Sequence, residues 1–125
     1  MKTISTAKAP AAVGPYSQAV QTGDFLFLSG QIPLVPETGL LISENISEQT
    51  EQVMKNMRAV CEAAGGGLNK IVKCTVFMTD LAQFQTMNEI YAKHFGDHKP
   101  ARSTIQVAAL PRGAAVEIEA IMYLK

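Results

Sequence analysis

The sequence has no surplus of charge of either sign and no cluster of basic residues. Its 11 lysines and arginines are balanced by 11 aspartates and glutamates, so the formal net charge is zero. Proteins that bind nucleic acids normally present a positively charged stripe or patch to the phosphates. The composition therefore predicts that the protein has no nucleic-acid partner.

Long apolar segments are missing as well. No run of about 18 apolar residues, the length that crosses a bilayer as a helix, occurs in the chain. The residues from Met1 to Ser5 also lack the apolar stretch of a secretory leader. We therefore expect a cytoplasmic protein without a membrane partner.

Cysteine and histidine are scarce. The 2 cysteines, Cys61 in a helical pattern and Cys74 in a strand pattern, cannot build a disulfide framework, and we expect both to be buried as small apolar residues. A catalytic thiol is the weaker alternative. The 2 histidines, His94 and His98, have the i, i+4 spacing of metal ligands, but Gly96 lies between them and no third ligand is evident. We therefore predict no metal site.

Apolar residues, in contrast, are plentiful. They make up 47% of the 125 residues, and this length predicts a single domain over residues 1–125. This is more apolar material than one small core needs, which indicates burial against another subunit. The run Phe25–Leu28 is apolar on both faces and predicts a strand that is covered on both sides.

The spacing of apolar and turn-forming residues predicts an α+β fold. After a short edge strand at Thr3–Thr6, the chain should form a hairpin, a helix, a strand, a second helix and a last hairpin. The first helix should end at Gly65, and Asp80 should cap the second. The expected segments are 17–21, 25–29, 47–64, 71–79 and the helix with the buried stripe Phe84, Met87, Tyr91 and Phe95. Together they predict a mixed, mostly antiparallel sheet with two helices packed on one face.

The last predicted hairpin carries the most informative charged residues. Arg102, Thr104 and Gln106 share one face of its first strand, and Glu117 and Glu119 share one face of its second. An arginine and a carboxylate would then lie close together on neighbouring strands. Periodicity alone does not distinguish a solvated ion pair from an anion-binding arginine beside a proton-transferring carboxylate.

Several motifs occur in a fixed order along nearly the whole chain. They are Gly14–Ala19, Leu28–Pro33, Lys73–Leu81, Met87–Tyr91, and finally Pro100–Ile105 with Ala108, Leu110 and Val116–Ile118. In this order they resemble the motifs of the RidA/YjgF family of enamine and imine deaminases. The resemblance implies a chorismate-mutase-like α+β fold, a homotrimer with sites between subunits, and small imino or enamino acids as the substrates, with no cofactor.

The resemblance also implies roles for individual residues. Arg102 would anchor the substrate carboxylate through two parallel hydrogen bonds, and Glu117 would direct water and protons. Tyr16 would be a further catalytic residue in the cleft. The remaining residues implied to line the cleft are Ser29, Gly30, Asn88 and Thr104. Without the resemblance, Tyr16 and Asn88 would be read as buried residues with satisfied polar groups.

One position departs from the family pattern, because many members have a cysteine where this chain has Thr104. Activity here should therefore not depend on a thiol at this position. Three functions remain open at this point: a deaminase of 2-imino acids such as 2-iminobutyrate and 2-iminopropionate, a non-catalytic module that binds 2-oxo acids, and an endoribonuclease. The zero net charge and the 2 histidines weaken the third.

Overall fold

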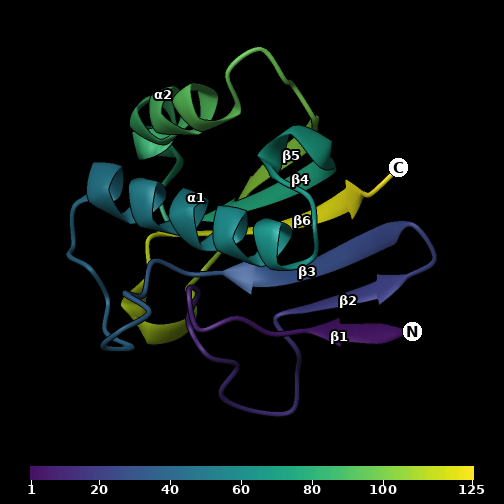
Figure 1. Ribbon diagram of the computed structural model, residues 1–125. Coiled ribbons are helices and arrows are strands. Elements are labelled where there is room, and N and C mark those ends of the chain that lie inside the picture. Colours follow the sequence, from purple (N-terminus) through teal and green to yellow (C-terminus); the bar gives the residue numbers. More distant parts are fainter.

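The computed structural model describes residues 1–125 as one six-stranded sheet with helices on one of its faces (Figure 1). The strand order is β1-β2-β3-β6-β4-β5, and all neighbours are antiparallel except β4 and β5. The strands are β1 Lys2–Ile4, β2 Ala19–Thr22, β3 Phe25–Gln31, β4 Ile71–Met78, β5 Ala101–Gln106 and β6 Val116–Tyr123. The predicted mixed, mostly antiparallel sheet is confirmed.

Two α-helices, α1 (Ile46–Ala63) and α2 (Phe84–Phe95), pack on the same face of this sheet, as predicted (Figure 1). The side chain of Asn45 caps α1 by accepting a hydrogen bond from the Glu48 amide at 3.0 Å. The helix ends before Gly65, whose φ of +89° lies in the left-handed region that glycine favours. Short 3-10 helices lie at Leu68–Lys70, Leu81–Gln83 and Pro111–Gly113.

The core lies between the two helices and the sheet. From α1 come Val53, Met54, Met57 and Val60, and from the sheet come Leu26, Cys74, Val76, Met78, Val116, Ile118 and Met122, all with no exposed surface. Met87, Tyr91 and Phe95 of α2 complete the core. The alternation along β4 and β6 therefore reflects one face packed on helices and one face open.

The predicted hairpin at the end of the chain is wrong. The strands β5 and β6 are separated by β4, to which β5 is parallel and β6 antiparallel. The linker crosses the end of β4, where the Val107 amide donates to the Met78 carbonyl at 2.8 Å and the Thr79 amide donates to the Ala115 carbonyl at 3.2 Å. This crossing gives the apolar strand β4 a hydrogen-bonded neighbour on each side, which a local hairpin would not provide.

The face of the sheet opposite the helices is open in the single chain. On β3, Leu26 and Leu28 are buried, whereas Phe25 and Phe27 are 43% and 46% exposed. Tyr123 of β6 packs against Phe25 on this open face, with ring centroids 5.0 Å apart. The sequence predicted that β3 is covered on both sides. In the isolated chain only its helix side is covered.

Two smaller features complete the fold. Asp80 caps the 3-10 helix Leu81–Gln83 instead of α2, because its carboxylate accepts from the Ala82 amide at 2.9 Å. Neither α-helix combines the length and the apolar character that a membrane crossing requires.

Candidate active site

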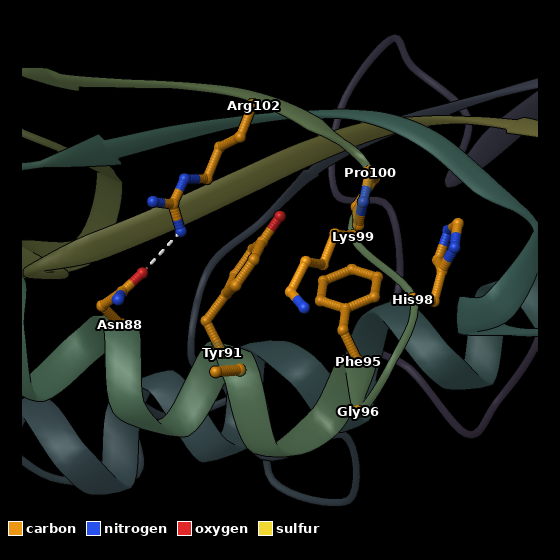
Figure 2. A pocket seen from close by; sticks show the side chains of 9 residues that line it. Asn88, Tyr91, Phe95, Gly96, His98, Lys99, Pro100 and Arg102 are labelled. Carbon is orange, nitrogen blue, oxygen red and sulfur yellow. Dashed lines mark hydrogen bonds between the residues drawn. The ribbon is translucent and has the colours of Figure 1, made fainter.

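Arg102 is held by one face of α2 (Figure 2). Its Nη1 donates to Asn88 Oδ1 at 2.7 Å, and its guanidinium carbon lies 4.8 Å from the centre of the Tyr91 ring and 5.4 Å from that of Phe84. Positions 84, 88 and 91 follow the i, i+4, i+7 spacing of one helix face. Since a planar cation stacks on aromatic rings, this face fixes the guanidinium while Arg102 stays exposed to solvent.

A cavity of about 370 Å³ adjoins the Arg102 side chain, between the end of α2 and the start of β5. Its lining residues are Asn88, Tyr91, Ala92, Phe95, Gly96, His98, Lys99, Pro100 and Arg102. The Tyr91 and Phe95 rings pack against each other with centroids 4.7 Å apart. A small ligand at Arg102 therefore has room to extend toward the end of α2.

Thr104 lies two residues beyond Arg102 on the same face of β5, opposite Val76 of β4. Its hydroxyl is buried and has no hydrogen-bond partner. The hydroxyl of Tyr91 is likewise buried without a hydrogen-bond partner. Burial, together with the neighbouring Cys74, raises the pKa of Tyr91 above its ordinary value, so this phenol stays protonated at neutral pH. Arg102, Asn88 and Thr104 thus form one group on the helix-covered face.

Glu117 forms a second group with residues of the N-terminal half. Gly30 of β3 approaches the Glu117 carboxylate so closely that a β carbon at this position would overlap the oxygen Oε2. Burial raises the pKa of Glu117 above that of an ordinary glutamate, and the negative charge of Glu119 adds to this shift. Glu117 is therefore a carboxyl group that accepts and returns protons closer to neutral pH than an exposed glutamate.

The Glu117 carboxylate borders a cavity of about 560 Å³. The lining residues are Ala11, Val13, Tyr16, Ser29, Gly30, Ile32, Leu34, Pro111, Arg112 and Glu117. The Ser29 hydroxyl donates to the Ser17 carbonyl at 2.6 Å, which ties β3 to the segment carrying Tyr16, and Tyr16 itself is 54% exposed. Tyr16 is therefore not the buried residue that its sequence alone suggested.

Within one chain the two groups do not meet. The prediction that Arg102 and Glu117 occupy the same face of adjacent strands is wrong, because β4 lies between β5 and β6. Arg102 is paired with the buried Cys74, on the helix side, whereas Glu117 is paired with Phe77, on the open side. The seven predicted residues accordingly divide into a group around Arg102 (Arg102, Asn88, Thr104) and a group around Glu117 (Tyr16, Ser29, Gly30, Glu117).

Sequence reasoning missed several residues at these sites. Phe84 and Tyr91 have no role at the site in the predictions from sequence, although their spacing with Asn88 is the signal that one helix face supports an arginine. Arg112 was not considered, and it lines the Glu117 cavity with a left-handed φ of +61°. Its Nη2 donates to the Gly39 carbonyl at 3.1 Å.

No three His, Cys, Asp or Glu side chains are grouped so that they could hold a metal ion. His94 instead lies between the two helices, with Nε2 2.9 Å from Glu51 Oε1 and Nδ1 3.1 Å from Arg58 Nη2. His98 donates from Nε2 to the Ile71 carbonyl. Both histidines therefore already have protein partners.

Comparison with known proteins gives consistent matches over nearly the whole chain. The family model described as endoribonuclease L-PSP matches residues 6–124. The chain is 54% identical to the reactive intermediate deaminase A of Arabidopsis thaliana, over 98% of this chain and 66% of that chloroplast protein. It is 51% identical to the mouse 2-iminobutanoate/2-iminopropanoate deaminase, over 96% of this chain and 89% of the mouse protein.

Solved structures show the same architecture. The crystal structure of Escherichia coli TdcF with bound serine superposes with a TM-score of 0.96 and 43% sequence identity, and the match covers 100% of both chains. The α+β architecture expected from the sequence is therefore that of a solved relative.

Proposed function

Because the chain belongs to the RidA/YjgF family, whose model is described as endoribonuclease L-PSP, we propose that it is a 2-enamine/2-imine deaminase. Its substrates are reactive imino acids such as 2-iminobutyrate and 2-iminopropionate, which it hydrolyses to 2-oxo acids and ammonia. The observation that carries this proposal is the Arg102 guanidinium, stacked on Tyr91 and fixed by Asn88 while exposed to solvent.

Arg102 binds the carboxylate of the substrate. A guanidinium presents parallel N–H groups that match the two oxygens of a carboxylate, and Arg102 uses only Nη1 for its bond to Asn88. Because the side chain is already oriented, little conformational entropy is lost when the ligand binds. Thr104 follows Arg102 by two residues on the same face of β5, where many family members have a cysteine, so a site built on Arg102 does not depend on a thiol.

Glu117 carries the protons of the hydrolysis. It accepts a proton from a water molecule that attacks C2 of the protonated imine, and the product of this step is a carbinolamine. It then returns the proton to the nitrogen, and as the C–N bond breaks and ammonia leaves, the ionised Glu117 carboxylate takes the proton of the carbinolamine hydroxyl, so that the carbonyl of the 2-oxo acid forms. Ammonia or bulk water then takes this proton from Glu117. The raised pKa of Glu117 suits a group that must first accept a proton from water and then donate it to the nitrogen. An enamine is first protonated at C3, which gives the same imine.

Tyr16, Ser29 and Gly30 shape the Glu117 side of the cleft. Gly30 has no β carbon, so its backbone groups and the adjacent carboxylate are open to a small substrate. The Tyr16 hydroxyl, on an exposed side chain in the same cavity, is the hydrogen-bonding partner for the attacking water.

Arg102 of one subunit and Glu117 of another form the complete cleft in a homotrimer. The separation of the two groups by β4 supports a shared site, because no single chain presents both to one small molecule. Phe25, Phe27 and Tyr123 on the open sheet face provide apolar surface that a closed cyclic assembly would bury.

The decisive experiment mixes two variants that are each expected to retain at most about a tenth of the wild-type activity. Arg102→Ala retains Glu117, and Glu117→Gln retains Arg102, so a trimer refolded from equal amounts of both contains some sites with both wild-type groups. With random assembly about a quarter of the sites are intact, and deaminase activity should recover to about that fraction of the wild-type activity. A mixture whose activity stays at the level of the separate variants would refute the shared cleft.

The control for this experiment is refolding of each variant alone, which must not raise its deaminase activity. Turnover of 2-iminobutyrate generated in situ distinguishes a deaminase from a module that only binds carboxylates. Wild-type protein that binds 2-oxobutyrate but releases no ammonia above the spontaneous rate would refute the deaminase function.

A further inference from the structure

A second positive charge lies beside the proposed carboxylate anchor. Lys99 and Arg102 both line the cavity of about 370 Å³ between α2 and β5, and no aspartate or glutamate is among its lining residues. In Figure 2 the side chains of Lys99 and Arg102 both point from this segment toward α2. A cavity lined by two cations and no carboxylate favours a ligand with more than one negative charge.

The polar groups that face this cavity are mainly hydrogen-bond donors. Lys99 contributes an ammonium group, Arg102 a guanidinium, and Asn88 its amide NH₂, because the Asn88 carbonyl oxygen already accepts from Arg102. Carboxylate oxygens accept hydrogen bonds without donating any. The donors in the wall therefore match an acidic group better than a hydroxyl or an amide.

The segment that carries Lys99 is fixed at both ends. Gly96, with a left-handed φ of +63°, ends α2 and turns the chain away from the helix. His98 is bound through Nε2 to the Ile71 carbonyl, and its ring lies 6.0 Å from the Phe95 ring. Lys99 is therefore presented from a defined backbone, three residues before Arg102 and on the same side.

We infer that this cavity is the side-chain pocket of the substrate site, and that it selects 2-imino acids that carry a second carboxylate on the side chain. The inference rests on the proposed function: Arg102 holds the carboxylate next to the imine, and Lys99 pairs with the distal one. The cavity volume falls within the range of about 300–1,000 Å³ that is usual for small-molecule sites. Imines formed by oxidation of acidic amino acids belong to this class.

Binding of unreactive 2-oxo acids tests the pocket without any turnover. Calorimetric titration of the wild-type protein should give about tenfold tighter binding of 2-oxoglutarate than of 2-oxobutyrate, since one charge-assisted pair is added. Lys99→Met should lose this preference and keep the affinity for 2-oxobutyrate. Lys99→Glu should bind 2-oxoglutarate more weakly than 2-oxobutyrate.

Lys93→Met is the matched control, because Lys93 is an exposed lysine of α2 that does not line the cavity. It should bind both acids like the wild type. Equal affinity of the wild type for both acids, or a preference that persists in Lys99→Met, would overturn the inference. Lys99 is exposed, so these variants should fold normally.

Turnover separates this inference from the proposed function. Imines generated in situ by flavin-dependent oxidases from glutamate and from 2-aminobutyrate should show about a tenfold difference in kcat/KM that depends on Lys99. If neither imine is hydrolysed while the Lys99-dependent binding preference remains, the deaminase function is refuted and the dicarboxylate pocket is supported. If both are hydrolysed at rates independent of Lys99, the deaminase stands and the pocket fails.

Discussion

Arg102 and Glu117 lie on opposite faces of one sheet, with β4 between the strands that carry them. Arg102 is in register with Cys74 and contacts α2, whereas Glu117 is in register with Phe77 and faces away from both helices. Because successive side chains of a strand alternate between faces, neither residue reaches the other's side without a change of register. A reaction that uses both groups on one small molecule therefore requires a second copy of the chain.

Replacement of Arg102 tests the anion anchor. Arg102→Ala removes a charge-assisted pair worth about 1.5–3 kcal/mol, so kcat/KM should fall by about tenfold to a hundredfold or more, and 2-oxobutyrate binding should be lost. Arg102→Lys keeps the positive charge but loses the parallel N–H groups of the guanidinium and the stacking on Tyr91. Its kcat/KM and its affinity for 2-oxobutyrate should lie between those of the wild type and Arg102→Ala. Titration calorimetry and steady-state kinetics measure both effects; normal ligand affinity in Arg102→Ala would show that the carboxylate binds elsewhere.

Gly30 is expected to matter for catalysis more than for stability. In Gly30→Ala the new methyl group overlaps Glu117 Oε2, and the end of a flexible side chain is what must move. We expect kcat to fall by about tenfold or more because Glu117, the proposed general base, is displaced, with a small change in Tm. Gly67→Ala is the control, since its β carbon would meet only the end of the Asn69 side chain at 3.0 Å. A Gly30→Ala variant with wild-type kcat would show that catalysis does not depend on the position of the Glu117 carboxylate.

Local patterns along the chain were sufficient to predict most of the fold. The sequence Gly23-Asp24 between two apolar runs specifies the β2–β3 hairpin, and the period of Val53, Met57 and Val60 specifies α1. Both signals depend on residues close in sequence, where turn chemistry and helical spacing act directly.

The pairing of β5 was not predictable in the same way. Its partner β4 precedes it by a whole helix, and a parallel pair leaves no turn motif in the sequence. The same non-local pairing decides which face Arg102 occupies, and hence that Phe84 and Tyr91 support it. The candidate residues were therefore identified individually through motifs, but their division into two groups required the structure.

The two cysteines should be inert in the folded protein. Burial raises the pKa of Cys61 to about 12 and also raises that of Cys74, and neither residue has exposed surface. Iodoacetamide at neutral pH should therefore modify neither thiol until guanidinium unfolds the chain, when both react. Mass spectrometry measures the modification. The variant Cys61→Ala with Cys74→Ala should keep deaminase activity if it remains folded, and a folded but inactive double variant would place a thiol in the reaction.

The raised pKa of Glu117 predicts a dependence of stability on pH. A carboxyl group whose pKa is higher in the folded state favours folding most when it is protonated. The wild type should therefore lose stability relative to Glu117→Gln as the pH rises from the unfolded-state pKa of glutamate through the raised folded-state pKa. Thermal unfolding of both proteins across this range measures the difference. If the difference in Tm between the wild type and Glu117→Gln does not change with pH, Glu117 has the same pKa in the folded and the unfolded state, which would contradict this prediction.

The same carboxyl group should determine how activity falls at low pH, the acid limb of the pH profile. In the proposed mechanism Glu117 takes a proton from water and must be ionised, so kcat/KM should fall as the pH drops through its raised pKa. Glu119→Gln removes the neighbouring negative charge that contributes to this shift, so the limb should move to lower pH while the plateau stays unchanged. Glu89→Gln, on an exposed position of α2, should leave the profile unaltered. A limb that stays in place or moves to higher pH in Glu119→Gln would mean that another group limits the reaction in acid.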